Sequence, residues 1–211
     1  MLNKYYQYSR QEMLEFVPAT CKRILDVGCG AGTFSRQLIE RQNVEVWGVE
    51  PVAEAANEAR KSLTKVINAY YEAGIDLPEN YFDCIIFNDV LEHMADPWKA
   101  LEMSKRFLSS DVPSFVVTSI PNFLYIRNVF NLFVSRDFHY TSEGILDKTH
   151  LRFFTKKSVI RLFEETNYNI VSLRGINPSL HPVFRLINFI AFDKLNDNAF
   201  LQYAVVAQKR S

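Results

Sequence analysis

Three closely spaced glycines constrain the fold of this 211-residue chain more than any other feature. Gly28, Gly30 and Gly32 stand between the apolar run of residues 23–29 and a segment with helical spacing, residues 33–41. Glycines at the end of a buried strand permit a tight turn and let a ligand approach the backbone closely. The following helix presents N–H groups that have no partner within its first turn. We therefore predict a strand, turn and helix with a ligand at the turn.

Strand-like and helix-like segments alternate along the rest of the chain. We expect a leading helix at 5–16, strands at 45–50, 65–69, 81–88, 114–120, 168–175 and 201–208, and helices at 52–63, 97–108 and 156–167. This alternation is typical of a Rossmann-like α/β fold, a mostly parallel sheet with helices on both faces. The length suits a single domain over residues 1–211. The stretches 121–155 and 177–198 interrupt the alternation, and we expect them to form insertions or a lid beside the ligand.

Composition and the terminal residues exclude several functional classes. The formal net charge is zero, which argues against a general nucleic-acid binder. Cys21, Cys29 and Cys84 lack metal-site spacing and fit a reducing compartment. Residues 1–13 contain no apolar signal segment, and the apolar stretch 123–134 is too short to span a bilayer. We expect a cytoplasmic chain without a transmembrane segment.

An acidic residue follows the glycine turn at the spacing of a nucleoside site. Glu50 ends the second predicted strand, twenty residues after Gly30, where a carboxylate can accept hydrogen bonds from both ribose hydroxyls. A dinucleotide fingerprint requires glycine at position 33, which is Thr33 here, so NAD is disfavoured. In an alternative interpretation, Glu50 caps the helix that begins at Val52.

The segment from Asp26 to Gly32 resembles the first motif of class I S-adenosylmethionine-dependent methyltransferases. Glu50 and Pro51 resemble the ribose-binding strand end of that family, and residues 77–97 resemble its segment around the fourth strand. The resemblance covers about residues 20–120. It implies a seven-stranded sheet with an antiparallel last strand, and S-adenosyl-L-methionine as the cofactor.

The resemblance also implies roles at the cofactor. The backbone of residues 28–30 would contact the methionine part, Asp26 would order the loop, Glu50 would hold the ribose, and Asn88 would lie near the amino group. The expected cofactor-binding residues are Asp26, Gly28, Cys29, Gly30, Glu50, Pro51, Tyr70, Asn88, Tyr6 and Arg10.

Two of these roles have open alternatives. The family often carries an acidic residue after the third strand to bind the adenine, and residues 68–71 contain none. Either Tyr70 or Tyr71 stacks on the adenine, or backbone groups alone bind it. Alternatively, both tyrosines belong to the core. Residues 1–20, which contain the leading helix, are expected to close over the cofactor, with Arg10 one turn after Tyr6. An exposed, solvated Arg10 is the alternative.

The acceptor side is expected in residues 121–155. Residues 144–155 resemble a motif of a methyltransferase subgroup often associated with polysaccharide biosynthesis. Transfer to a hydroxyl needs a general base, and we expect His150 to be that base and Asp147 to orient it. Alternatively, both residues tie the lid to the sheet through buried hydrogen bonds.

The chain is also similar to ubiquinone-pathway O-methyltransferases at residues 89–93. That resemblance leaves open a metal ion on Asp89, Glu92 and His93. We expect no metal, because the sequence Leu-Glu-His also occurs in methyltransferases where the histidine is structural.

The acceptor itself is predicted only by class. Residues 88–91 read Asn-Asp-Val-Leu and lack the motif of enzymes that methylate DNA bases or protein glutamine. We favour oxygen on a small molecule, a sugar or a nucleotide sugar. The alternatives are a quinone or aromatic acceptor, and a catalytically silent cofactor-binding module in a polysaccharide assembly complex. The apolar segments 123–134 and 182–192 could cover the acceptor, form a homodimer face, contact a lipid-linked sugar or cap the sheet.

Overall fold

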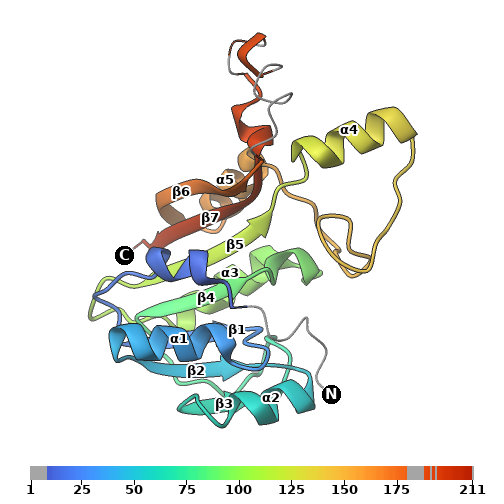
Figure 1. The fold of residues 1–211 in the computed structure, drawn as a ribbon. Coiled ribbons are helices and arrows are strands. Elements are labelled where there is room, and N and C mark those ends of the chain that lie inside the picture. The colour runs from blue at the N-terminus through green and yellow to red at the C-terminus, as the bar shows by residue number, and fades with distance from the viewer. Residues whose placement is uncertain (1–8, 180–187, 191, 193, 211) are drawn as a thin grey trace.

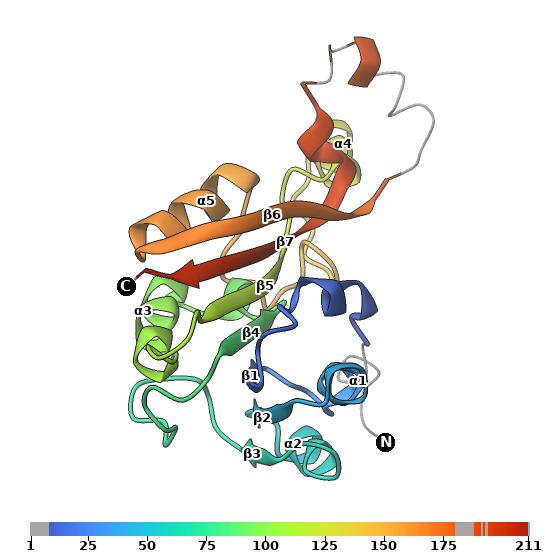
Figure 2. The ribbon, with the colours of Figure 1, turned by 90° about the vertical axis from the view of Figure 1, so that its left-hand side faces the viewer.

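One seven-stranded sheet organises the computed structural model, which describes residues 9–179, 188–190, 192 and 194–210 (Figures 1 and 2). The strand order is β3-β2-β1-β4-β5-β7-β6. The neighbours from β3 to β5 pair in parallel, whereas β7 is antiparallel to both β5 and β6. This confirms the predicted fold class. The strands are β1 (Arg23–Val27), β2 (Glu45–Val49), β3 (Lys65–Ile67), β4 (Cys84–Asn88), β5 (Phe115–Pro121), β6 (Tyr168–Pro178) and β7 (Phe200–Lys209).

Helices cover both faces of the sheet. Figure 2 shows α1 (Thr33–Gln42) and α2 (Ala53–Ala59) on one face, and α3 (Pro97–Phe107) and α5 (Lys156–Glu165) on the other. A helix not expected from the sequence, α4 (Ile126–Ser135), follows β5 and projects away from the sheet (Figure 1). The short 3-10 helices are η2 (Gln11–Phe16), η3 (Leu91–His93) and η4 (Asn196–Ala199).

Local sequence signals explain where α3 and α5 begin. The Asp96 side chain accepts a hydrogen bond from the Lys99 amide at 2.9 Å, and Pro97 occupies the first helical position. Thr155 and Ser158 form a reciprocal capping box at the start of α5. These capping contacts define the first residues of both helices.

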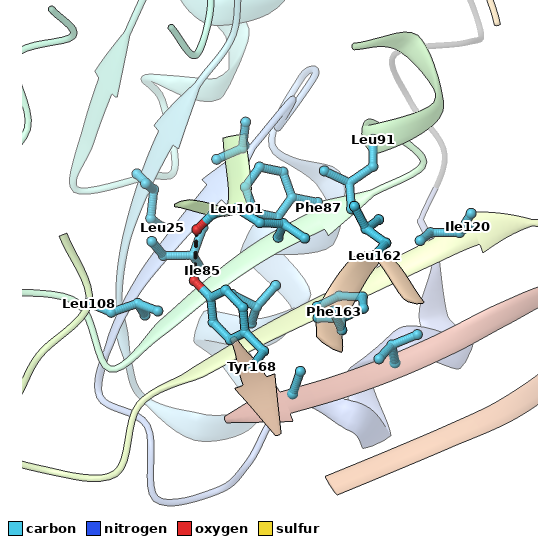
Figure 3. Close-up of a cluster of buried hydrophobic side chains, with 14 of the residues drawn as sticks. Leu25, Ile85, Phe87, Leu91, Leu101, Leu108, Ile120, Leu162, Phe163 and Tyr168 are labelled. Carbon is cyan, nitrogen blue, oxygen red and sulfur yellow. Dashed lines mark hydrogen bonds between the residues drawn. The ribbon is translucent and has the colours of Figure 1, made fainter. Parts of the chain in front are cut away.

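The larger core layer lies between the sheet and the pair α3 and α5. Figure 3 shows Ile85 and Phe87 of β4 packed with Leu162 and Phe163 of α5, all fully buried. The Tyr168 hydroxyl donates a hydrogen bond to the Leu101 carbonyl oxygen at 3.0 Å (Figure 3). This bond joins the start of β6 to α3.

The structure differs from the expected elements in the apolar segments. The described part of the leading helix is η2 alone, since residues 1–8 lie outside the described residues. No residue of α4 is buried, and Phe130 and Phe133 are exposed, so the interpretation of residues 123–134 as a cap over the sheet is wrong. Among the described residues, no helix is both long and apolar enough to cross a membrane.

The buried hydroxyl of Tyr168 yields a stability prediction. Tyr168→Phe removes the donor to Leu101 and should lower the free energy of unfolding by about 1 kcal/mol. Urea denaturation followed by circular dichroism measures this change. Tyr70→Phe, at a side chain that is 71% exposed, is the control and should change stability by less than about 0.5 kcal/mol. Equal stability of the Tyr168→Phe variant and the parent would contradict the assigned bond.

Candidate active site

The glycine turn after β1 adopts a backbone conformation that side chains disfavour. Gly28 and Gly30 have φ angles of 72° and 55°. A Cβ atom on Gly28 would lie 2.6 Å from the Cγ2 atom of Val90. The amides of Gly28 and Cys29 donate to the Val49 carbonyl oxygen at 2.8 and 3.3 Å. The turn is therefore held against the end of β2 and close to the segment that follows β4.

Asp26 stabilises the turn from within. Its buried carboxylate accepts a hydrogen bond from the Ser35 hydroxyl at 2.5 Å, which joins β1 to α1. Burial raises the pKa of Asp26 to about 7, although the hydrogen bond from Ser35 opposes this shift.

Glu50 connects the turn to the next helix. One carboxylate oxygen accepts from the Gly30 amide and the other from the Val52 amide, each at 2.9 Å. Val52 is the N-cap residue of α2. The hydrogen bond from its amide is therefore the helix-capping contact that the alternative interpretation of Glu50 predicted. Burial raises the pKa of Glu50, and the two amide hydrogen bonds act in the opposite direction. Each oxygen keeps a further lone pair that a hydroxyl group can use.

A cavity of about 310 Å³ lies beside this turn, at the carboxyl ends of β1, β2 and β4. Among its lining residues are Arg10, Asp26, Gly28, Cys29, Gly30, Glu50, Pro51, Tyr70 and Asn88, all of which the sequence predicted. Tyr6 lies outside the described residues. Val90 and Met94 also line the cavity, and no chemical signal in the sequence distinguished them from ordinary core residues.

Asn88 supplies a test of whether this cavity suits a polar ligand. Its side-chain oxygen and nitrogen are buried and have no hydrogen-bond partner among the described residues. An unsatisfied buried amide is unfavourable by about 1–3 kcal/mol for each group. A ligand with both donors and acceptors, such as the amino acid part of S-adenosylmethionine, would satisfy both atoms.

The two tyrosines after β3 have different environments. Tyr71 is largely buried, its hydroxyl is 2.9 Å from the Ser104 hydroxyl, and its ring lies edge-on to Phe87 at 5.5 Å. Tyr70 is 71% exposed at the edge of the cavity. Both tyrosines line the cavity, but Tyr71 is held by core contacts, whereas Tyr70 is largely exposed.

Arg10 and Asp89 form an ion pair beside the cavity. Both have positive φ angles, 44° and 53°. The Asp89 carboxylate also accepts hydrogen bonds from the Ser119 hydroxyl and the Gln202 amide, each at 2.7 Å. Asp89 thus joins Arg10 to β5 and β7.

A second cavity, of about 380 Å³, adjoins the first and shares Arg10, Asp89 and His93 with it. Glu92, Glu143, Asp147, His150, Asn177 and Gln202 are further polar residues in its lining. The segment 141–155 is held at the second cavity by two backbone hydrogen bonds. The amides of Leu151 and Arg152 donate to the Glu92 carbonyl oxygen at 2.8 and 3.0 Å.

His150 is oriented differently from the expectation. Its Nδ1 atom lies 2.9 Å from the Ile145 carbonyl oxygen. The Asp147 carboxylate instead accepts from the amide and the hydroxyl of Thr149, both at 2.7 Å. Burial opposes ionisation of Asp147, but these hydrogen bonds and the nearby His150 and His93 hold its pKa below the ordinary value. Asp147 therefore shapes the loop, and the Ile145 carbonyl contacts the imidazole.

Glu92 and His93 lie next to His150. The two imidazole rings are in edge-to-face contact with centroids 4.6 Å apart. Burial and the neighbouring His150 lower the pKa of His93, which favours the neutral ring. The Glu92 carboxylate is buried and accepts no hydrogen bond from the described residues, and burial raises its pKa to about 8. Asp89 does not belong to this group, since its carboxylate binds Arg10, Ser119 and Gln202.

The chain matches a known protein family and several known proteins. A methyltransferase domain family matches residues 2–173. An uncharacterized methyltransferase of Schizosaccharomyces pombe is 37% identical over an alignment of 110 residues, with 44% of this chain and 38% of that protein covered. The chain thus spans well under half the length of this relative. A ubiquinone biosynthesis O-methyltransferase of Neisseria meningitidis is 24% identical over 164 residues, covering 74% of this chain and 67% of that enzyme.

Solved structures share the fold along nearly the whole chain. A SAM-dependent methyltransferase from Archaeoglobus fulgidus superposes with a TM-score of 0.71 at 20% identity, covering 98% of this chain and 97% of that one. The Burkholderia thailandensis 1,6-didemethyltoxoflavin-N1-methyltransferase, determined with bound S-adenosylhomocysteine, gives a TM-score of 0.64 at 14% identity, with 97% and 80% covered. Because the family match covers residues 2–173, most of the sequence, the chain belongs to the methyltransferase domain family.

Proposed function

We propose that this chain methylates an oxygen atom of a small polar acceptor, of which a sugar is the best example, bound in the second cavity. The observation that carries the proposal is the position of that cavity, which adjoins the glycine-turn cavity across Arg10, Asp89 and His93. Its many hydrogen-bonding side chains suit a molecule rich in hydroxyl groups.

Residues of the first cavity would hold the methyl donor. The amides of the glycine turn and the unsatisfied Asn88 side chain would bind the amino acid part, the Glu50 carboxylate the ribose hydroxyls, and Tyr70 the adenine ring. S-adenosylmethionine supplies a methyl group made electrophilic by its positively charged sulfur. The protein mainly aligns the acceptor with that methyl group and excludes water.

His150 is the general base of this proposal. A neutral imidazole that donates from Nδ1 to the Ile145 carbonyl carries its lone pair on Nε2, and His150 lines the second cavity. That lone pair can accept the proton of an acceptor hydroxyl. Asp147 is a positioning residue, because it fixes the loop through Thr149.

The charged residues that line the second cavity indicate which class of acceptor it favours. The carboxylates of Glu92, Glu143 and Asp147 line it, and so does the guanidinium of Arg10. Carboxylates disfavour a polyanion, so a neutral sugar fits this cavity better than the diphosphate of a nucleotide sugar.

A quinone or another aromatic metabolite is the second candidate acceptor. The similarity to a ubiquinone biosynthesis O-methyltransferase favours it. So does a group of aromatic rings beside His150: Phe153 contacts Phe123 and Phe138 at centroid distances of 5.2 and 5.6 Å.

Methyl-labelled cofactor tests the acceptor class. Incubation with labelled S-adenosylmethionine and parallel panels of neutral sugars, nucleotide sugars and hydroxylated aromatics should place label on a sugar oxygen, as read by mass spectrometry. Label only on the aromatic compounds would favour the second candidate. Cofactor binding without transfer to any panel would support the silent module, and absence of cofactor binding would overturn the assignment of the first cavity.

Glu50→Gln should weaken the binding of S-adenosylhomocysteine about 10- to 100-fold. The amide loses the charge and one acceptor atom that the Gly30 amide, the Val52 amide and the ribose hydroxyls share. Titration calorimetry measures the affinity. Glu54→Gln on the exposed side of α2 is the matched control and should bind like the parent. Unchanged affinity of the Glu50→Gln variant would exclude the ribose contact.

His150→Ala should lower kcat by roughly two orders of magnitude while the affinity for S-adenosylhomocysteine stays within about twofold. The reason is that the side chain lines the second cavity and not the first. Steady-state turnover and calorimetry give the two readouts. The control His139→Ala, at an exposed position outside both cavities, should retain kcat. A His150→Ala variant with parental kcat would remove His150 from the mechanism.

A further inference from the structure

The carboxylate of Glu92 is not explained by the binding of cofactor or acceptor. It is 1% exposed, and neither of its oxygens accepts a hydrogen bond from the described residues. A buried and unpaired carboxylate destabilises a fold by several kcal/mol unless it is protonated or meets a cation. The carboxylate of Asp83, similarly buried, illustrates the usual solution, since it pairs with Arg23 and accepts from two backbone amides. The Glu92 carboxylate has no such hydrogen bonds among the described residues, and the charge of Arg10 offsets its burial only in part.

Two histidines lie within reach of this carboxylate. One ligand atom each from Glu92, His93 and His150 can be chosen so that all three lie within 4.8 Å of one another. Three ligand atoms on one ion with bonds of about 2.1 Å lie about 3.4–3.6 Å from one another. The three side chains would therefore close on an ion by movements of about 1 Å or less.

Both imidazoles have the backbone partner that histidine ligands commonly have. The Nδ1 atom of His150 is 2.9 Å from the Ile145 carbonyl oxygen. The Nδ1 atom of His93 is 3.2 Å from the Thr149 carbonyl oxygen and 3.0 Å from the Thr149 hydroxyl. A carbonyl that accepts from Nδ1 fixes the tautomer with the lone pair on Nε2 and orients the ring toward a metal.

The backbone brings the three side chains together without a ligand. His150 precedes the two amides, of Leu151 and Arg152, that donate to the Glu92 carbonyl oxygen. The Arg152 guanidinium also contacts the Ala95 carbonyl oxygen. The cluster is thus assembled from η3 and from a segment almost sixty residues later in the chain.

We propose that Glu92, His93 and His150 bind one divalent transition-metal ion, with zinc or cobalt as the type of ion that a two-histidine, one-carboxylate set prefers. This set differs from the one suggested by resemblance, because Asp89 is engaged by Arg10 and His150 takes part. Three protein ligands leave at least one coordination position for a small molecule in the second cavity.

The effect of the ion on catalysis rests on the proposed function. A hydroxyl coordinated to the ion loses its proton to solvent more readily. Its oxygen then forms the new bond to the methyl carbon as the bond from that carbon to sulfur breaks. In the metal-loaded protein His150 serves as a ligand, and the ion replaces it in activating the acceptor.

Cobalt binding tests the site without any cofactor or acceptor. The full chain, stripped with a chelator and free of any histidine tag, is titrated with Co²⁺ and followed by visible absorption, then with Zn²⁺ by calorimetry. One equivalent should bind with a spectrum lacking thiolate character, because Cys21, Cys29 and Cys84 are buried elsewhere. Glu92→Gln should weaken Co²⁺ binding at least tenfold. Glu143→Gln, in the same cavity but outside the cluster, is the matched control and should bind like the parent.

Thermal unfolding separates a ligand from a structural residue. Zn²⁺ should raise the Tm of the parent and not that of Glu92→Gln. Without metal, the Glu92→Gln variant should have a Tm at least as high as the parent, because the amide removes a buried charge. Equal cobalt affinity of parent and Glu92→Gln, or the absence of cobalt binding, would overturn the site. Full transfer activity of the chelator-stripped protein would leave the proposed function intact and refute the role of the ion in it.

Discussion

The carboxylate of Glu50 accepts hydrogen bonds from the amides of Gly30 and Val52, and much of the molecule is arranged around that contact. It fixes the glycine turn, which follows β1, against the start of α2. The turn itself needs glycine, since Gly28 has a positive φ and its missing side chain leaves room for Val90. Asp26 and Ser35 hold the other side of the turn. A single strand-end carboxylate thus sets the shape of the first cavity.

The strand order explains why both cavities lie where they do. The chain passes outward from β1 to β3 and then returns to place β4 on the other side of β1. At this reversal, the connections leave the sheet in opposite directions and open a crevice at the carboxyl ends of the strands. The segment 88–93 emerges at that point. Asn88 and Val90 line the first cavity, Glu92 lines the second, and Asp89 and His93 line both.

The cofactor half could be predicted from the sequence because its contacts are nearly local. Gly28, Gly30 and Glu50 belong to one strand–helix–strand unit, and their spacing in the sequence reflects their contact in space. The acceptor half could be predicted only in part. The sequence pointed to His150 as a candidate base, and the structure places it in the second cavity, but its contact with His93 and the buried state of Glu92 depend on hydrogen bonds between distant segments.

Two expectations failed or changed for the same reason. The Asp147 carboxylate, expected to orient His150, accepts from Thr149, a nearer donor in its own loop. The α4 helix could not be recognised as an exposed helix, because its apolar residues resemble those of a buried segment. The role of an apolar or ionisable side chain depends on the groups that it contacts. The sequence around α4 and around Asp147 does not specify those contacts.

The two cavities share only Arg10, Asp89 and His93 among their described lining residues. The remaining acceptor-side groups come largely from residues 121–155. The end of this segment is joined to the residues after β4 by two amide hydrogen bonds to the Glu92 carbonyl oxygen and by contacts of Thr149 with His93 and of Arg152 with the Ala95 carbonyl oxygen. The Glu92 carbonyl and the two amides are backbone groups, so these two hydrogen bonds do not require a particular side chain. A relative can therefore carry a different acceptor-side segment, and prefer a different acceptor, while the donor cavity is kept. In the same way, a chimera that replaces residues 141–150 with those of a relative should change the acceptor preference and keep cofactor binding.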